Sequence, residues 1–151
     1  MRCETAAMEN PHKSAATLRV YVVEDSPQIR ERLERMISAV PRLEVVGSAD
    51  NPAAAVADIE TLQPDALVVD IQIIGGSGLD VLSRVRRRQP GIRSIVLTNF
   101  SSSQHRKAAQ DAGSNYFLDK TNEFSQVTPI LQQWRDAKSA PSSSTPFTGN
   151  T

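Results

Sequence analysis

Short apolar runs alternate with helical patterns five times along the chain, and this alternation constrains the fold more than any other feature. The runs are Leu18–Val23, Leu43–Gly47, Ala66–Val69, Ser94–Leu97 and Asn115–Leu118. Strands separated by helices form parallel sheets, because a parallel connection has to cross over the sheet. The first run is almost wholly apolar, which is typical of a strand covered on both faces. We therefore predict an α/β domain with a doubly wound, five-stranded parallel sheet and helices on both faces.

Each run is followed by a helical pattern, and several of these patterns have recognisable start signals. Ser26-Pro27 and Asn51-Pro52 place a capping side chain before a proline, which is favoured in the first helical turn. Apolar residues after the first cap recur at helical spacing, so we expect the charged residues between them, Arg30 included, to face away from the core. Pro129 has no amide hydrogen to donate, so we expect it to kink or restart the last helix.

Length and composition predict one folded domain between two polar tails. The chain has 151 residues, which is enough for a single sizeable core. We expect residues 18–137 to fold, and residues 1–17 and the Ser/Pro-rich residues 138–151 to be disordered. The last helix is followed by no helix-turn-helix pattern, so we expect no DNA-binding output domain.

Charge and apolar patterning argue against several classes of protein. Seventeen basic residues balance seventeen acidic ones, so no excess positive charge is available for nucleic acid or anionic lipid. The cluster of Arg84, Arg86, Arg87 and Arg88 ends a helical pattern, where cations stabilise the helix dipole, and we expect it to be solvated. The single cysteine and the lack of a long apolar segment predict a cytoplasmic protein without membrane contact.

Chemically active side chains follow four of the five strands. The first strand ends at Glu24 and Asp25, the third at Asp70, the fourth at Thr98 and the fifth at Lys120. Because the carboxyl ends of parallel strands meet at one edge of a sheet, we expect these groups to converge. Clustered carboxylates repel one another unless a cation neutralises them, and oxygen ligands suit Mg²⁺. With a lysine and a hydroxyl beside them they could hold a phosphoryl group, with an aspartate as nucleophile.

This pattern resembles the receiver domain of bacterial response regulators. The residues that carry the resemblance are Glu24-Asp25, Asp70, Gly78-Leu79, Thr98 and Lys120, and it extends over residues 18–137. It implies the flavodoxin-like (βα)5 fold and a two-component signalling protein that receives a phosphoryl group from a sensor histidine kinase or a histidine phosphotransfer protein. It also implies Mg²⁺ as cofactor. Such a protein catalyses its own phosphorylation and dephosphorylation and is not an enzyme with a separate substrate.

The resemblance assigns roles at the acidic cluster. Asp70 would be the phosphoacceptor and, with Asp25, a direct Mg²⁺ ligand. Glu24 would bind the ion mainly through water, and Gln72 through its backbone carbonyl.

The resemblance also implies a switch. Thr98 would bind one phosphoryl oxygen and Lys120 another, and Phe117 occupies the family's aromatic switch position. Their movement would change the face made by the fourth helix, fifth strand and fifth helix, which would bind a downstream protein. We expect a stand-alone regulator whose target is another protein, and homodimerisation through this face stays open.

Three other interpretations compete with this one. A phosphorylation-independent adaptor would use the receiver fold to bind a signalling partner, but it has no need for the clustered charges. A haloacid-dehalogenase-like phosphatase also has an aspartate nucleophile, but Gln72 stands where that family has a second acid. The glycines of Gly75–Gly78 do not match the G-x-G-x-x-G pattern of dinucleotide binding, and they follow the third strand instead of the first.

Several positions near the expected site depart from the family's pattern. Ile74 and Thr121 replace prolines, and Asn99 replaces a small residue on the path to the phosphoryl group. We expect these changes to alter rates and coupling while the chemistry is retained. Gln72 and Phe100 flank the position of the attacking water in the family, so we expect them to set the lifetime of the aspartyl phosphate. A Phe100→Glu variant with an unchanged half-life would contradict this.

Overall fold

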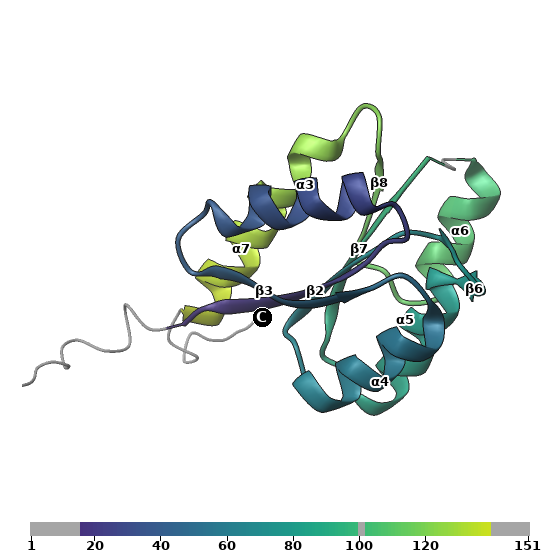
Figure 1. The fold of residues 1–151 in the computed structure, drawn as a ribbon, viewed down its shortest axis with the longest axis horizontal. Helices are drawn as coiled ribbons and strands as arrows, with labels where there is room; N and C mark the ends of the chain where they lie inside the picture. Colours follow the sequence, from purple (N-terminus) through teal and green to yellow (C-terminus); the bar gives the residue numbers. More distant parts are fainter. Residues whose placement is uncertain (1–15, 100–101, 140–151) are drawn as a thin grey trace, which may run out of the picture.

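A five-stranded parallel sheet forms the centre of the protein. The structure, a computed structural model, describes residues 16–99 and 102–139, and Figure 1 shows their fold. The strands are β2 (Leu18–Val23), β3 (Leu43–Ala49), β4 (Ala66–Val69), β7 (Arg93–Thr98) and β8 (Tyr116–Asp119). They lie in the order β3-β2-β4-β7-β8, and all neighbouring strands pair in parallel. The predicted sheet is confirmed, while most residues of the two expected tails lie outside the described part of the chain.

Helices cover both faces of this sheet. They are α3 (Pro27–Ser38), α4 (Pro52–Leu62), α5 (Gly78–Arg88), α6 (Ser103–Asp111) and α7 (Val127–Ser139). One apolar core lies between the sheet and the pair α3 and α7, and a second lies between the sheet and α4, α5 and α6 (Figure 1). Along β2, Val20 and Val22 belong to the first core, and Tyr21 and Val23 to the second. Successive side chains of a strand point to opposite faces, which explains why this run is apolar throughout.

The expected capping signals start α3 and α4. The Ser26 hydroxyl accepts a hydrogen bond from the amide of Ile29 at 3.3 Å. The Asn51 side-chain carbonyl accepts one from the amide of Ala54 at 2.9 Å. In both helices a proline occupies the first turn, where its missing amide hydrogen removes no helical hydrogen bond. These local interactions fix where each helix leaves the carboxyl edge of the sheet.

One segment adds to the elements expected from the sequence, and the restart expected at Pro129 is confirmed. The glycine-rich segment after β4 forms a small antiparallel hairpin of β5 (Gln72–Ile73) and β6 (Gly76–Ser77). Its turn needs a positive φ at Gly75, of 85°, which glycine adopts without strain. In the last helix, Pro129 is the third residue of α7, which begins at Val127 after a short 3₁₀ turn. The helix therefore restarts just before the proline, within the turn whose amides need no helical partner.

The arginine cluster at the end of α5 is only partly solvated. Arg84, Arg87 and Arg88 are exposed as expected, but Arg86 is half-buried. A Cβ atom added at Gly113, whose φ is 97°, would lie 2.0 Å from Nη1 of Arg86. The expectation of a wholly solvated cluster is thus wrong at Arg86, because its long side chain packs across the backbone where α6 ends.

Candidate functional site

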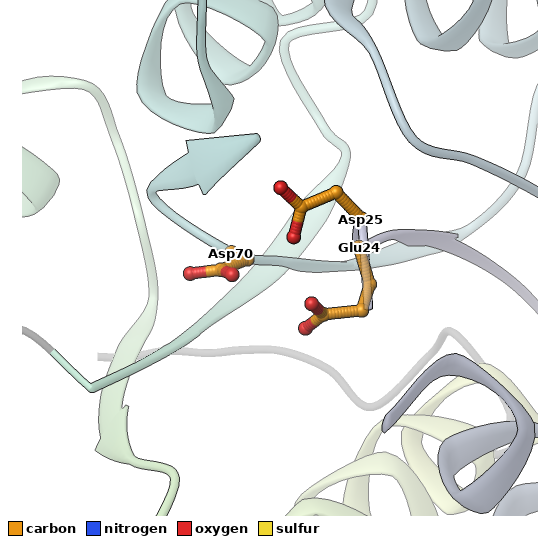
Figure 2. Close-up of side chains that lie close together, drawn as sticks. All are labelled: Glu24, Asp25 and Asp70. Carbon is orange, nitrogen blue, oxygen red and sulfur yellow. The ribbon is translucent and has the colours of Figure 1, made fainter. Parts of the chain in front are cut away.

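The ends of two paired strands bring three carboxylates together. Val23 of β2 pairs with Val69 of β4, and Glu24-Asp25 and Asp70 directly follow these partners. Carboxylate oxygens of the three residues all lie within 4.8 Å of one another. Figure 2 shows the side chains of Glu24 and Asp25 pointing toward Asp70. The predicted convergence therefore follows from strand pairing alone.

Lys120, which directly follows β8, brings a positive charge into this cluster. Its Nζ lies 2.8 Å from Oε1 of Glu24 and 2.9 Å from Oδ2 of Asp70. The three side chains are nearly enclosed, with exposures of 9% for Lys120, 2% for Glu24 and 8% for Asp70. The backbone amide of Lys120 donates to the carbonyl of Thr98 at 2.9 Å, which ties the end of β8 to the end of β7. One ammonium thus pairs with two buried carboxylates.

Burial and charge act on the pKa values of this group in opposite directions. Burial raises the pKa of Glu24 above its ordinary value, and the nearby Lys120 only partly offsets this. Burial by itself would lower the pKa of Lys120, but hydrogen bonds and charge attraction from Glu24 and Asp70 outweigh it and raise that pKa. Lys120 therefore stays an ammonium at neutral pH.

The cluster opens into a hollow of about 450 Å³ at the carboxyl edge of the sheet. Its lining includes the three carboxylates, Lys120, Gln72 and Asn99. Several carboxylates with open space beside them are the donor set that hard divalent cations prefer, and one lysine leaves part of the negative charge uncompensated. The residues present therefore fit Mg²⁺, with room for a phosphoryl-sized group next to it.

The two predicted switch residues lie on one face of the sheet. Val96 of β7 pairs with Phe117 of β8, and both pack in the core under α4, α5 and α6. Thr98 stands two residues after Val96, so its side chain is on the same face. Thr98 is completely buried, and Phe117 is half-buried. Phe100 lies outside the described residues.

Two neighbours of Glu24 were not among the expected site residues. The amide of Ser26 donates to Oε2 of Glu24 at 3.0 Å, and Nη1 of Arg30 donates to the Glu24 carbonyl at 3.1 Å. The expectation that Arg30 faces away from the core is wrong, because its side chain reaches back from the first turn of α3 to the end of β2. An arginine in the first turn after an acidic strand end is the signal that would have indicated this contact.

Comparison with known families matches residues 20–132 to the response regulator receiver domain. The chain belongs to this family. Receiver domains are phosphorylated signalling domains that bind Mg²⁺ at an acidic cluster, and Glu24, Asp25 and Asp70 form such a cluster here.

Curated relatives are longer than this receiver domain. It is 30% identical over 103 residues to the DNA-binding transcriptional activator DevR/DosR of Mycobacterium tuberculosis, covering 68% of this chain and 48% of that protein. It is 36% identical over 110 residues to a protein-glutamate methylesterase/protein-glutamine glutaminase of Photobacterium profundum, covering 71% of this chain and 27% of that protein. The matches thus span about half or less of these relatives.

Solved receiver domains have the same fold. The signal receiver domain of NarL from Mycobacterium tuberculosis gives a TM-score of 0.74 at 26% identity, covering 80% of this chain and 98% of that one. The response regulator domain of CheB from Thermotoga maritima gives 0.69 at 26% identity, covering 83% and 98%. Within residues 16–99 and 102–139, no helix has the length and apolar character needed to cross a membrane.

Proposed function

We propose that this receiver domain accepts a phosphoryl group on Asp70 from the phosphohistidine of a sensor histidine kinase or a histidine phosphotransfer protein. The observation that carries the proposal is the pairing of one buried ammonium, that of Lys120, with both Glu24 and Asp70 beside a hollow. A structural role alone gives no reason to bury two carboxylates at a strand edge, because burying charge costs stability. Catalysis of phosphoryl transfer does need such positioned charges.

Each residue has a defined part in the proposed transfer. A carboxylate oxygen of Asp70 attacks the phosphorus, the phosphorus–nitrogen bond of the phosphohistidine breaks, and the imidazole leaves. Asp25, Asp70 and the backbone carbonyl of Gln72 would hold Mg²⁺, with Glu24 acting mainly through water, and the bound ion would neutralise charge on the phosphoryl oxygens. The Lys120 ammonium would move from the carboxylate of Asp70 to a phosphoryl oxygen, so the transferred group gains a cationic partner.

We further propose that phosphorylation is read out on the face made by α6, β8 and α7. The Thr98 hydroxyl would donate to a phosphoryl oxygen, and Phe117 would turn inward on the same face of the sheet. This changes the surface that a downstream protein contacts, by shifting the population of two conformations. The stand-alone arrangement expected from the sequence stays a prediction, which the size of the protein in cell extracts checks.

Phosphorylation by acetyl phosphate tests the proposal directly. Wild-type protein with Mg²⁺ should gain one acid-labile phosphoryl group, which mass spectrometry of the modified peptide should assign to Asp70. The Asp70→Asn variant should gain none. Asp80→Asn is the matched control, because Asp80 is an exposed aspartate of α5 outside the cluster. Undiminished labelling of Asp70→Asn would refute the assignment.

A phosphorylation-independent adaptor is the second candidate. It is favoured by Ile74, a residue that is 59% exposed in the turn of the hairpin and stands in place of the usual proline. An exposed apolar side chain next to a functional edge suits binding of a partner protein. The two functions differ in one result: an adaptor binds its partner equally well as wild type, as Asp70→Asn, and with or without acetyl phosphate.

A further inference from the structure

Helix α6 is held to the rest of the protein by few buried contacts. Of its residues Ser103–Asp111, Ala109 alone is buried. A helix normally gains its stability by burying an apolar stripe, and a single alanine provides little of it. The position of α6 over the sheet therefore depends on the other contacts that this helix makes.

One of these contacts joins α6 to Phe117. The guanidinium carbon of Arg106 lies 4.6 Å from the centroid of the Phe117 ring. Among the residues that the structure describes, no carboxylate forms an ion pair with Arg106, and its guanidinium lies over the Phe117 ring instead. A guanidinium over an aromatic face at this distance is attracted by the ring's quadrupole.

The Arg106–Phe117 contact borders an open space on the α6 side of β8. A hollow of about 230 Å³ between α6 and β8 is lined by Arg106, Ala109 and Gln110 on one side and by residues 114–117 on the other. Thr98 lies on the same face of the sheet, one strand away and two residues further toward the carboxyl edge. If the Phe117 ring turns toward Thr98, it loses its contact with the Arg106 guanidinium. If the ring stays in place, it keeps this contact.

We propose that Arg106 is a positioning residue that holds Phe117 in the arrangement in which Lys120 pairs with the unmodified Asp70 carboxylate. The inference rests on the proposed function. Phosphorylation then has to break the Arg106–Phe117 contact before the ring can turn inward. Loss of Arg106 should therefore strengthen binding of a phosphoryl mimic by about two- to fivefold, which corresponds to a cation–π contact at an exposed site.

The experiment has two arms. In the first, calorimetry measures the affinity for beryllofluoride in the presence of Mg²⁺ for wild type, Arg106→Ala, Arg106→Lys and Lys107→Ala. Lys107→Ala is the matched control, because this substitution removes the neighbouring positive charge of α6. Lys107 pairs with Asp111 and not with the Phe117 ring. We expect tighter binding for Arg106→Ala, partial return to the wild-type value for Arg106→Lys, and no change for Lys107→Ala.

A double-mutant cycle separates the contact from a general effect on stability. In a Phe117→Leu background, Arg106→Ala should have no further effect on beryllofluoride affinity. An Arg106→Ala effect of the same size in both backgrounds would overturn the inference, and so would wild-type affinity for Arg106→Ala.

The second arm does not depend on phosphorylation. NMR of protein with labelled phenylalanine, assigned with Phe117→Leu, should show a shift of the Phe117 ring signals in Arg106→Ala and not in Lys107→Ala. Unchanged ring signals would refute the contact itself. A third outcome separates the contact from the proposed function. If the ring signals shift but wild type and Asp70→Asn both fail to bind beryllofluoride, the Arg106–Phe117 contact is supported. The proposed function is then refuted, and so is the coupling of this contact to phosphorylation.

Discussion

Gly78 begins α5 where this helix lies close to the end of β4. Its amide donates to the carbonyl of Ile71 at 2.8 Å. A Cβ atom added at Gly78 would lie 1.8 Å from the backbone oxygen of Asp70 and 2.5 Å from Cγ1 of Val69. Real Cβ atoms essentially never approach other atoms below 3.0 Å, so a Gly78→Ala substitution requires a shift of more than 1 Å. The shift has to move either the start of α5 or the end of β4, because the first atom in the way is backbone.

We predict two measurable effects of Gly78→Ala. Overpacking of this kind costs about 1–3 kcal/mol, and we expect the free energy of unfolding to fall by about 2–3 kcal/mol because the obstacle is backbone and cannot rotate away. A displacement of about 1 Å at a reacting group can cost about 100-fold in rate. We therefore expect phosphorylation of Asp70 by acetyl phosphate to slow by roughly 10- to 100-fold.

Urea denaturation and the initial rate of phosphorylation test this prediction. Gly91→Ala is the matched control, since an added Cβ there meets no atom within 4 Å. Its free energy of unfolding should stay within about 0.5 kcal/mol of wild type or rise slightly, because alanine lowers the entropy of the unfolded chain. A Gly78→Ala protein as stable and as readily phosphorylated as Gly91→Ala would refute the close-approach reasoning.

Three further substitutions have defined outcomes in denaturation experiments. Lys120→Ala leaves Glu24 and Asp70 buried without their ammonium. Without divalent cations its free energy of unfolding at pH 7 should be about 3–5 kcal/mol lower than that of wild type, and Mg²⁺ should restore part of this difference. Wild-type stability of the variant would contradict this. Tyr21→Phe removes a 2.6 Å hydrogen bond to Asp58 and should cost about 1 kcal/mol at neutral pH. Burial and Asp58 raise the pKa of Tyr21 in the folded protein. Above about pH 10 the unfolded chain gives up this proton first, so the stability of wild type should fall, and that of Tyr21→Phe should fall less. Parallel stability–pH profiles of the two proteins would count against this. Gly113→Ala should cost about 1–2 kcal/mol, because φ is 97° and Arg86 lies against the position of the new Cβ; an unchanged denaturation midpoint would exclude the packing of Arg86 there.

Periodicity and capping residues were sufficient to predict the elements that carry the site. The strand that ends at Val69 places Asp70 at the carboxyl edge whatever its neighbours are, because this depends only on where the apolar run stops. The serine, asparagine and prolines that start α3 and α4 act through contacts within three residues. Local preferences of this kind can be predicted without knowledge of the packing.

Contacts between distant segments could not be predicted in this way. The expectation for Arg30 failed because a helical pattern says which side of a helix is polar, not whether a long side chain can reach the preceding strand. The same holds for Arg86, which packs on Gly113 from another helix. The role of Arg106 also depends on a neighbour, Phe117, that its own helical pattern does not indicate.

The sequence by itself determined the order of the five main strands and their helices, the capped starts of α3 and α4, and the chemical groups at the strand ends, since each of these depends on residues close together in the chain. Only the tertiary structure decided that β2 lies between β3 and β4, that Lys120 reaches a carboxylate 50 residues away, and that Arg106 covers Phe117. Such contacts follow from how the sheet and its two helical layers pack, and packing depends on the whole chain at once.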